Sequence, residues 1–381
     1  MKVLQRYFTS EIVRSVLFTL AAFLALFAFF DLTTELPSVG RGGYKLQHAF
    51  FFVLLGLPSY AYELMPIAAL IGTIYTLSQF AARSEFTIMR VSSMSTMMTA
   101  KILFKIGLLF VVATVLIGEF VAPKSAEFAE KVKLQAKGAS ISQKFKTGLW
   151  SKDVIRTGAG ADGASGDIVG SRFINIGEIR PNGQLVGVKL YEFDRNMHMS
   201  AMILASHADY QGKNIWRMDD VVQTDFANGA STADITSSIA TKKFPSKDLV
   251  SEITPDILSV LFADPDHMSA YNLWAYSQHL AENNQHTERY DIAFWKKLVY
   301  PLSVFVMMAL ALPFAYLHFR TGGVSLKIFT GIMIGVSFQL VNTLFSHLGL
   351  LNTWPPFFTA ALPSTIFLLI AIGALWKIER Q

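Results

Sequence analysis

The hydrophobic and polar positions divide the chain into long apolar runs and one long, more polar insert. A helix that crosses a bilayer needs about 20 mostly apolar residues. Runs that meet this requirement lie at residues 16–36, 49–82, 102–122, 294–317, 328–348 and 357–376. The sequence therefore predicts six membrane spans. The first is expected to be uncleaved, because no small-x-small site follows it.

The second run is too long for one straight crossing. Pro58 and Pro66 interrupt it, and Glu63 lies between them. Proline removes a helical hydrogen bond and disturbs the preceding turn. We therefore predict a short re-entrant or interfacial piece, followed by a span from about Leu64.

The insert, residues 124–291, has a different pattern. It opens with a helical stretch, 125–138, that Gly138 stops, and an amphipathic helix is expected at 269–282. Between them lie a Gly- and Ala-rich mobile loop at 157–170 and short β-rich runs at 173–179, 184–193, 200–210, 215–222 and 233–241. Asn-Gly pairs at 182–183 and 228–229 favour hairpins. Many short strands without intervening helices indicate a sandwich, a jelly roll or an open barrel.

The predicted fold class is thus an α-helical membrane protein with six transmembrane helices and an inserted, jellyroll-like all-β domain. The expected divisions are 1–123, 124–291 and 292–381. Composition agrees, since 52% of residues are hydrophobic, 16% are charged and the mean hydropathy is +0.39. Soluble domains carry about 25% charged residues. The absence of cysteine excludes disulfides, thiolate metal sites and cysteine nucleophiles.

The positions of lysine and arginine predict the orientation, because cytoplasmic loops carry an excess of them. With six spans, the basic groups fall on one side: Lys2, Arg6, Arg14, Arg83, Arg90, Lys101, Lys105, Arg320, Lys327, Lys377 and Arg380. Both termini are then cytoplasmic and the β domain is extracytoplasmic. Membrane topology accounts for these bases, so nucleic acid is not implied.

Motifs for catalysis are missing from the sequence. GxxxxGK(S/T), HExxH and GxSxG do not occur, and the eight histidines are scattered. Asp219-Asp220 and the pair Asp264 and Asp266 read as turn or strand-end residues. We expect no catalytic residue, no metal and no cofactor in this chain.

The loop at residues 81–95 is polar and lies between two apolar runs. As a short helix it would place Phe86, Met89, Arg90 and Ser93 on one face. Apolar and charged side chains together suit docking into a partner's groove. The alternative is an ordinary positively charged cytoplasmic loop.

Charged residues near the outer ends of the spans are candidates for lipid contact. Asp31, Glu35 and Glu63 either mark span boundaries or face a partly wet internal cavity. Basic or aromatic side chains that could meet an anionic headgroup are Arg41, Tyr44, Lys45, Lys131 and Lys133. For the last two, a solvated helix face is the alternative. The 31 phenylalanines, concentrated in the spans, also suit a cavity that holds acyl chains.

Five segments carry a family resemblance. They are LPSYAYELMPIAALIGTIYTLSQFAARSE at 57–85, GEFVAP at 118–123, GLWSKD at 148–153, YPLSVFVMMALALPF at 300–314 and PPFFTAALPS at 355–364. In this order they resemble the LptF/LptG permeases, the membrane subunits of the lipopolysaccharide export ABC transporter. The GLWSKD element and the insert after it are more similar to the LptG branch.

The resemblance implies a multi-pass protein of the bacterial inner membrane with its β-jellyroll in the periplasm. It implies a heterodimer with an LptF-like permease, two LptB-like ATPase subunits that bind ATP and Mg, an LptC-like single-span protein and an LptA-like periplasmic bridge. Lipopolysaccharide would be the cargo. The family's ATPase-coupling helix would transfer to Arg83, Ser84, Glu85, Phe86, Met89 and Arg90.

The sequence departs from the family pattern where headgroup contacts are expected. Some members have lysines at the outer end of span one, where this chain has Asp31 and Glu35. Some have two bases on the helix after span three, where this chain has Glu130 and Lys133. A second function class stays open, a membrane-anchored binding or signalling module with a β sensor or scaffold domain. An integral-membrane hydrolase would need a clustered nucleophile or metal site.

Overall fold

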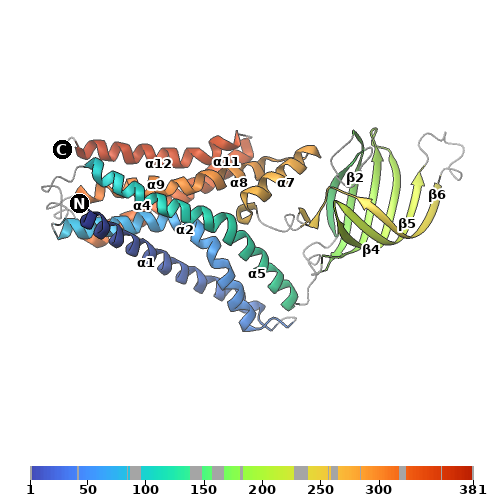
Figure 1. Ribbon diagram of the computed structural model, residues 1–381, viewed down its shortest axis with the longest axis horizontal. Helices are drawn as coiled ribbons and strands as arrows, with labels where there is room; N and C mark the ends of the chain where they lie inside the picture. Colours follow the sequence, from blue (N-terminus) through green and yellow to red (C-terminus); the bar gives the residue numbers. More distant parts are fainter. Residues whose placement is uncertain are drawn as a thin grey trace.

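The computed structural model describes residues 2–40, 43–83, 85, 96–137, 148–156, 167–180, 183–226, 239–255, 257–258, 265–283, 285–316, 323–352 and 354–379. A helical bundle and a curved β-sheet lie at opposite ends of an elongated molecule (Figure 1). Both chain termini lie at the end of the bundle farthest from the sheet.

Within the described ranges, six helical segments are long and apolar enough to cross a membrane, as the sequence predicts. Spans one and two are α1 (Lys2–Glu35) and α2 (Leu46–Ala82), joined through the 3₁₀ turn η1 (Leu36–Ser38). Span three comprises α4 (Thr96–Leu116), the π-turn η2 (Ile117–Val121) and α5 (Ala122–Lys137). Span four comprises α8 (Glu288–Val299), η6 (Tyr300–Leu302), α9 (Ser303–Ala311) and α10 (Pro313–Tyr316). Spans five and six are α11 (Val324–Asn352) and α12 (Pro356–Glu379).

The predicted break in the second span is wrong. Helix α2 is continuous over 37 residues, with Pro58 and Pro66 inside it. A proline in a membrane helix is tolerated where packed neighbours support the backbone, and residues 64–74 of α2 are buried throughout. At about 1.5 Å per residue the helix is about 55 Å long, so it exceeds the roughly 30 Å hydrocarbon core. Figure 1 shows it changing direction along its length.

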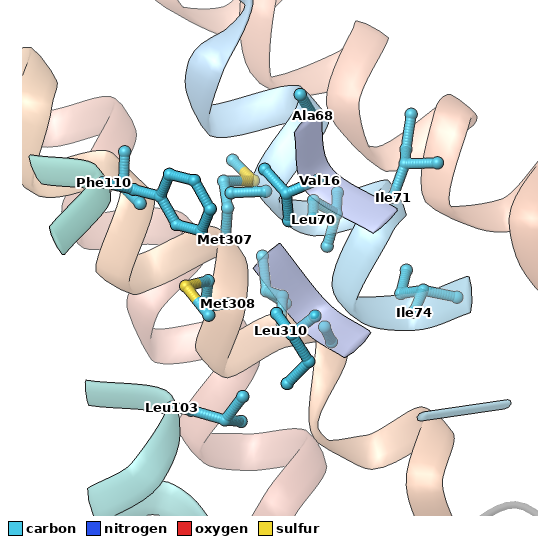
Figure 2. Packing of buried hydrophobic residues seen from close by; sticks show 14 of the residues in the cluster. Val16, Ala68, Leu70, Ile71, Ile74, Leu103, Phe110, Met307, Met308 and Leu310 are labelled. Atoms are coloured by element: carbon cyan, nitrogen blue, oxygen red, sulfur yellow. The ribbon is translucent and has the colours of Figure 1, made fainter. Parts of the chain in front are cut away.

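The core of the bundle forms around α2. Val16 of α1, Leu70 of α2, Leu103 of α4 and Met307 of α9 belong to one buried cluster (Figure 2). Gly72 lets α1 approach closely, because a Cβ there would lie 2.6 Å from the backbone nitrogen of Val16. Small residues at helix contacts are the usual means of close packing in membranes.

The insert contains an antiparallel sheet of meander order. Among the described residues its strands are β1 (Leu149–Arg156), β2 (Ile168–Ile179), β3 (Leu185–Asp194), β4 (Met199–Gly212), β5 (Ile215–Phe226) and β6 (Ile239–Val250). An inserted all-β domain is therefore confirmed. The expected strands from 173 to 222 fall within β2–β5, whereas β1 was not predicted. Of the run at 233–241, residues 233–238 lie outside the described residues.

The ends of the insert agree closely with the predicted pattern. Helix α5 ends at Lys137, directly before the expected stop. Helix α7 (Ala270–Glu282) follows the short η5 (Pro265–His267), and the Ser269 side chain caps it by accepting from Asn272 N. Of the predicted loop at 157–170, residues 168–170 already belong to β2.

The interior of the β domain is apolar and is filled except for one small cavity. Leu190, Ile203, Met218 and Trp216 are almost fully buried in a single cluster with their neighbours. A cavity of about 150 Å³ opens beside the ends of β1 and β6. Such a volume is below the roughly 300–1,000 Å³ of ordinary ligand pockets, so it cannot hold a lipid with several acyl chains.

Candidate functional site

Three of the residues singled out for lipid contact meet at the end of the bundle nearer the sheet. The Lys133 ammonium of α5 donates to the Glu35 carboxylate of α1 at 2.5 Å. The Tyr44 hydroxyl donates to the other oxygen of Glu35 at 3.3 Å. The side chains of Lys133 and Glu35 are 22% and 13% exposed. We call Glu35, Tyr44 and Lys133 the outer cluster.

Local structure explains why these groups converge. Glu35 is the last residue of α1, and the chain then reverses so that Tyr44 is buried against it. Gly40, at a φ of +91°, donates its N–H to Tyr44 O at 2.8 Å and closes this turn. Burial and the neighbouring Glu35 carboxylate raise the pKa of Tyr44 to about 12. The Lys133 ammonium also lies 4.2 Å from the centre of the Phe52 ring.

The other acid of the first span has its own partner. Asp31 lies one turn before Glu35 and accepts a hydrogen bond from the Tyr60 hydroxyl of α2 at 3.0 Å. The two acids of the first span that depart from the family pattern thus fix α1 to its neighbours. Glu63, the third acid, lines a pocket of about 280 Å³.

The remaining basic candidates do not join the outer cluster. Lys131 pairs with Glu127 one turn away at 2.6 Å, on the exposed face of α5. Lys45 is exposed, and its backbone N–H donates to His48 Nδ1 at 3.0 Å at the start of α2. Arg41 lies outside the described residues.

The candidate coupling loop begins where α2 ends, at the end of the bundle that carries the chain termini (Figure 1). Arg83 is the C-cap of α2, and its guanidinium lies 3.9 Å from the Glu85 carboxylate. The Tyr7 hydroxyl of α1 donates to Glu85 at 3.4 Å. Ser84, Phe86, Met89 and Arg90 lie outside the described residues.

Sequence reasoning missed a contact that joins the third span to α7. The Glu119 carboxylate, in the π-turn η2, accepts from Ala270 N at 2.9 Å and from Tyr271 N at 3.4 Å. An anion at a helix N-terminus satisfies unpaired backbone N–H groups and the helix dipole. The adjacent Gly118 packs against the ring of Tyr62 in α2. An acid 151 residues from its partner gives no sequence signal, so only the fold reveals this contact.

The C-terminal end of α7 is joined to the sheet by polar contacts. The Lys152 ammonium of β1 donates to Asn283 O at 2.9 Å, and Arg156 pairs with Glu282 at 3.2 Å. The ring of His279 lies 3.8 Å from Glu252. Burial lowers the pKa of His279, while Asp153 and Glu282 oppose that shift. We call Lys152, Arg156, Glu252, His279 and Glu282 the α7 junction.

A buried ion pair holds the edge strand β1 in place. The Arg172 guanidinium lies 3.3 Å from the fully buried Asp153 carboxylate and 2.9 Å from Glu192. Ser251, which follows β6, donates its hydroxyl to Asp153 at 2.7 Å. These bonds bring the two edges of the sheet together at one end. In the described part of the chain, no group of three or more acids or histidines is placed to hold a metal ion.

Comparison with known proteins gives full-length matches. The family described as lipopolysaccharide export system permease LptF/LptG matches residues 6–377. The lipopolysaccharide export system permease protein LptG of Escherichia coli is 30% identical over 380 residues, which cover 100% of this chain and 98% of that protein. The protein of the same name from Haemophilus influenzae is 27% identical over 379 residues, covering 99% and 98% respectively.

Proposed function

The chain belongs to the LptF/LptG family of lipopolysaccharide export system permeases, and from that premise we propose its role. It is the permease subunit of an ABC transporter that extracts lipopolysaccharide from the outer leaflet of the inner membrane. It passes this lipid towards a periplasmic bridge for outer-membrane assembly. The observation that carries the proposal is the match over residues 6–377, which includes the spans and the β insert alike.

The proposed orientation follows from charge and from the positions of the chain ends. Both termini and the start of the coupling loop lie at one end of the bundle, and the sheet lies beyond the other (Figure 1). In the described chain, Arg14 near the start of α1, Arg83 at the end of α2 and Lys377 near the end of α12 lie toward the former end, and basic residues there are typical of a cytoplasmic face. We therefore place the β domain in the periplasm.

The proposed partners are an LptF-like permease, two LptB-like ATPases, an LptC-like protein and an LptA-like bridge. The exposed apolar surface of helix α1 suits contact with a second permease or with lipid, because its Phe18 and Phe29 side chains are 76% and 65% exposed. ATP and Mg belong to the ATPase subunits in this proposal. Docking on them would use the segment from Arg83 to residue 90, which includes Glu85.

Lipid extraction needs continuous apolar cover. Each acyl methylene exposed to water costs about 0.8 kcal/mol, so several bare chains would cost tens of kcal/mol. The apolar interior of this β domain is filled, so acyl chains would enter it only if the sheet opened. The alternative within the complex is that the chains pass through the partner permease's β domain.

We propose that a lipid phosphate competes with the Glu35 carboxylate for the Lys133 ammonium. The Lys133 ammonium is already bonded to Glu35, so a lipid phosphate must displace that carboxylate. Lys45 and Lys131 are exposed and can meet the phosphate at lower cost. In the outer cluster, Lys133 would thus exchange its bond to Glu35 for a bond to the phosphate when lipid binds.

A crosslinking experiment on the whole complex tests the proposal. A photoreactive residue at position 45 or 133 should label lipopolysaccharide in an ATP-dependent manner. The same residue in place of Lys213, which is exposed in the turn after β4, serves as the control. A membrane-anchored sensor would instead copurify without a stoichiometric ATPase and would give no lipid adduct at any of these positions.

A further inference from the structure

A polar pocket lies inside the bundle, at the end nearer the sheet. It has a volume of about 280 Å³ and is bounded by α2, α8, α11 and η5. Tyr300 closes one wall, since its hydroxyl donates to the backbone carbonyl of Glu63 at 2.5 Å. Nothing in the proposed export route assigns a role to this pocket.

The pocket is lined by ionisable side chains of both kinds, and two of them, Glu63 and Lys297, form no direct ion pair with each other. The Lys297 ammonium lies 4.7 Å from the centre of the Tyr62 ring, and no described residue gives it a hydrogen bond or an ion pair. The Glu63 carboxylate likewise has no such partner within the described ranges. Lys296 differs, because it pairs with Asp266 at 3.0 Å.

An unpaired charge in a half-buried position is costly unless a ligand or water solvates it. Charged side chains within a membrane bundle usually mark a functional site for this reason. The pocket also offers an acceptor, because Gln339 Oε1 is buried with no hydrogen-bond partner in the described chain. Arg289, two turns before Lys297 on α8, also lines the pocket. The pocket therefore holds groups that suit a cation, Glu63 and Gln339, and a group that suits an anion, Lys297.

We propose that this pocket binds a phosphoethanolamine group carried by a lipid. The phosphate lies at Lys297, and the ammonium lies at Glu63 and Gln339. Thr343, His347 and Leu350 of α11 line the pocket and are exposed, so it opens sideways. The neighbouring Leu340 and Leu344 of α11 are 66% and 54% exposed, and they offer a surface for acyl chains. A volume of 280 Å³ holds a headgroup rather than a whole lipid.

The test is native mass spectrometry on the complete transporter, freed of cargo and titrated with phosphatidylethanolamine or phosphatidylglycerol. The two lipids share the phosphate, but only the first has the ammonium. We expect the wild type to retain phosphatidylethanolamine about 10-fold better, the scale of a charged hydrogen bond. Glu63→Gln should abolish this preference, and Lys297→Met should lower the retention of both lipids about 10-fold. Lys124→Met, at an exposed position on α5, should leave both unchanged.

Two further arms make the result decisive. If Lys297→Met does not assemble, Glu63→Gln and competition by soluble glycerophosphoethanolamine decide the matter. Lipopolysaccharide with and without phosphoethanolamine, in phosphatidylglycerol alone, shows whether the group belongs to a resident phospholipid or to cargo. Equal retention of the two phospholipids and of the two cargoes would overturn the proposal, as would a preference that survives Glu63→Gln. Either failure leaves export, tested by crosslinking at residue 133, untouched.

Discussion

The ion pair between Glu35 and Lys133 should restrain the bundle and also limit lipid binding. At 2.5 Å and an effective dielectric constant of about 20, the attraction between the two charges is about 7 kcal/mol. Desolvation of two partly buried ions offsets most of this energy. We expect a net coupling of about 1–2 kcal/mol, above the 0–1 kcal/mol that is usual for an exposed pair.

A double-mutant cycle measures that coupling. Glu35→Gln and Lys133→Gln should each lower the stability of the detergent-solubilised complex by about 1–2 kcal/mol, because each leaves a partly buried charge unpaired. The double variant should cost little more than the worse single variant. Glu127→Gln is the matched control, since it breaks the exposed pair with Lys131 and should cost about 0.5 kcal/mol or less. Additive effects of the two single changes would refute the coupling.

The same variants separate restraint from lipid contact. Glu35→Gln leaves the Lys133 ammonium available, so lipopolysaccharide crosslinking at position 45 should rise several-fold. Lys133→Gln should lower it, although both variants lose the same ion pair. If the variants only damaged the structure, crosslinking at position 45 would change in the same direction in Glu35→Gln and Lys133→Gln. A loss of crosslinking in both variants would therefore show that Lys133 does not contact the lipid phosphate.

Other contacts give further predictions. Glu119→Ala removes the acceptor of the first two N–H groups of α7 and leaves the Ser269 cap in place. It should cost about 1 kcal/mol of stability, with faster amide exchange at Ala270 and Tyr271 as the specific readout. Gly118→Ala places a Cβ 2.4 Å from the Tyr62 ring and should destabilise the complex by about 1–3 kcal/mol in thermal unfolding, whereas unchanged stability would contradict this packing. Burial lowers the pKa of His279 in the folded state, so stability should be lost as pH falls below about 6.5, the value in the unfolded chain; this loss should shrink in His279→Gln.

Hydropathy and turn residues predicted the six spans, α7 and four of the strands, because each of these has a strong local signal. The break expected in α2 fails for a physical reason. A proline removes one backbone hydrogen bond, but the segment around Pro66 is buried against neighbouring helices, where such a proline is tolerated. Strand β1 was missed because its sequence carries Asp153, an acid atypical of a buried strand. Arg172 and Ser251, distant in sequence, supply the bonds that allow its burial.

For the candidate site, too, local sequence signals predict only part of the structure. The sequence suggested that Asp31, Glu35 and Lys133 lie near a lipid headgroup, and the structure brings Glu35 and Lys133 together. The sequence could not indicate that these two residues pair, because the pairing depends on contact between α1 and α5, and the two residues are 98 positions apart. The positions of acids and bases can be read from local pattern. Which charges neutralise each other is decided by the tertiary fold.

The contacts along the molecule form one mechanical path. Helix α2 runs unbroken from Arg83 past Tyr62, where the ring packs on Gly118 of the third span. The next residue, Glu119, holds the N-terminus of α7, and the α7 junction binds that helix to β1. A helix without a break transmits displacement along its axis, and packed interfaces do not deform continuously. Movement imposed at Arg83 is therefore expected to reach the sheet through α7. The β domain should then shift together with spans two to four. Helix α1, which its described contacts fix to α2 and α5, should follow them.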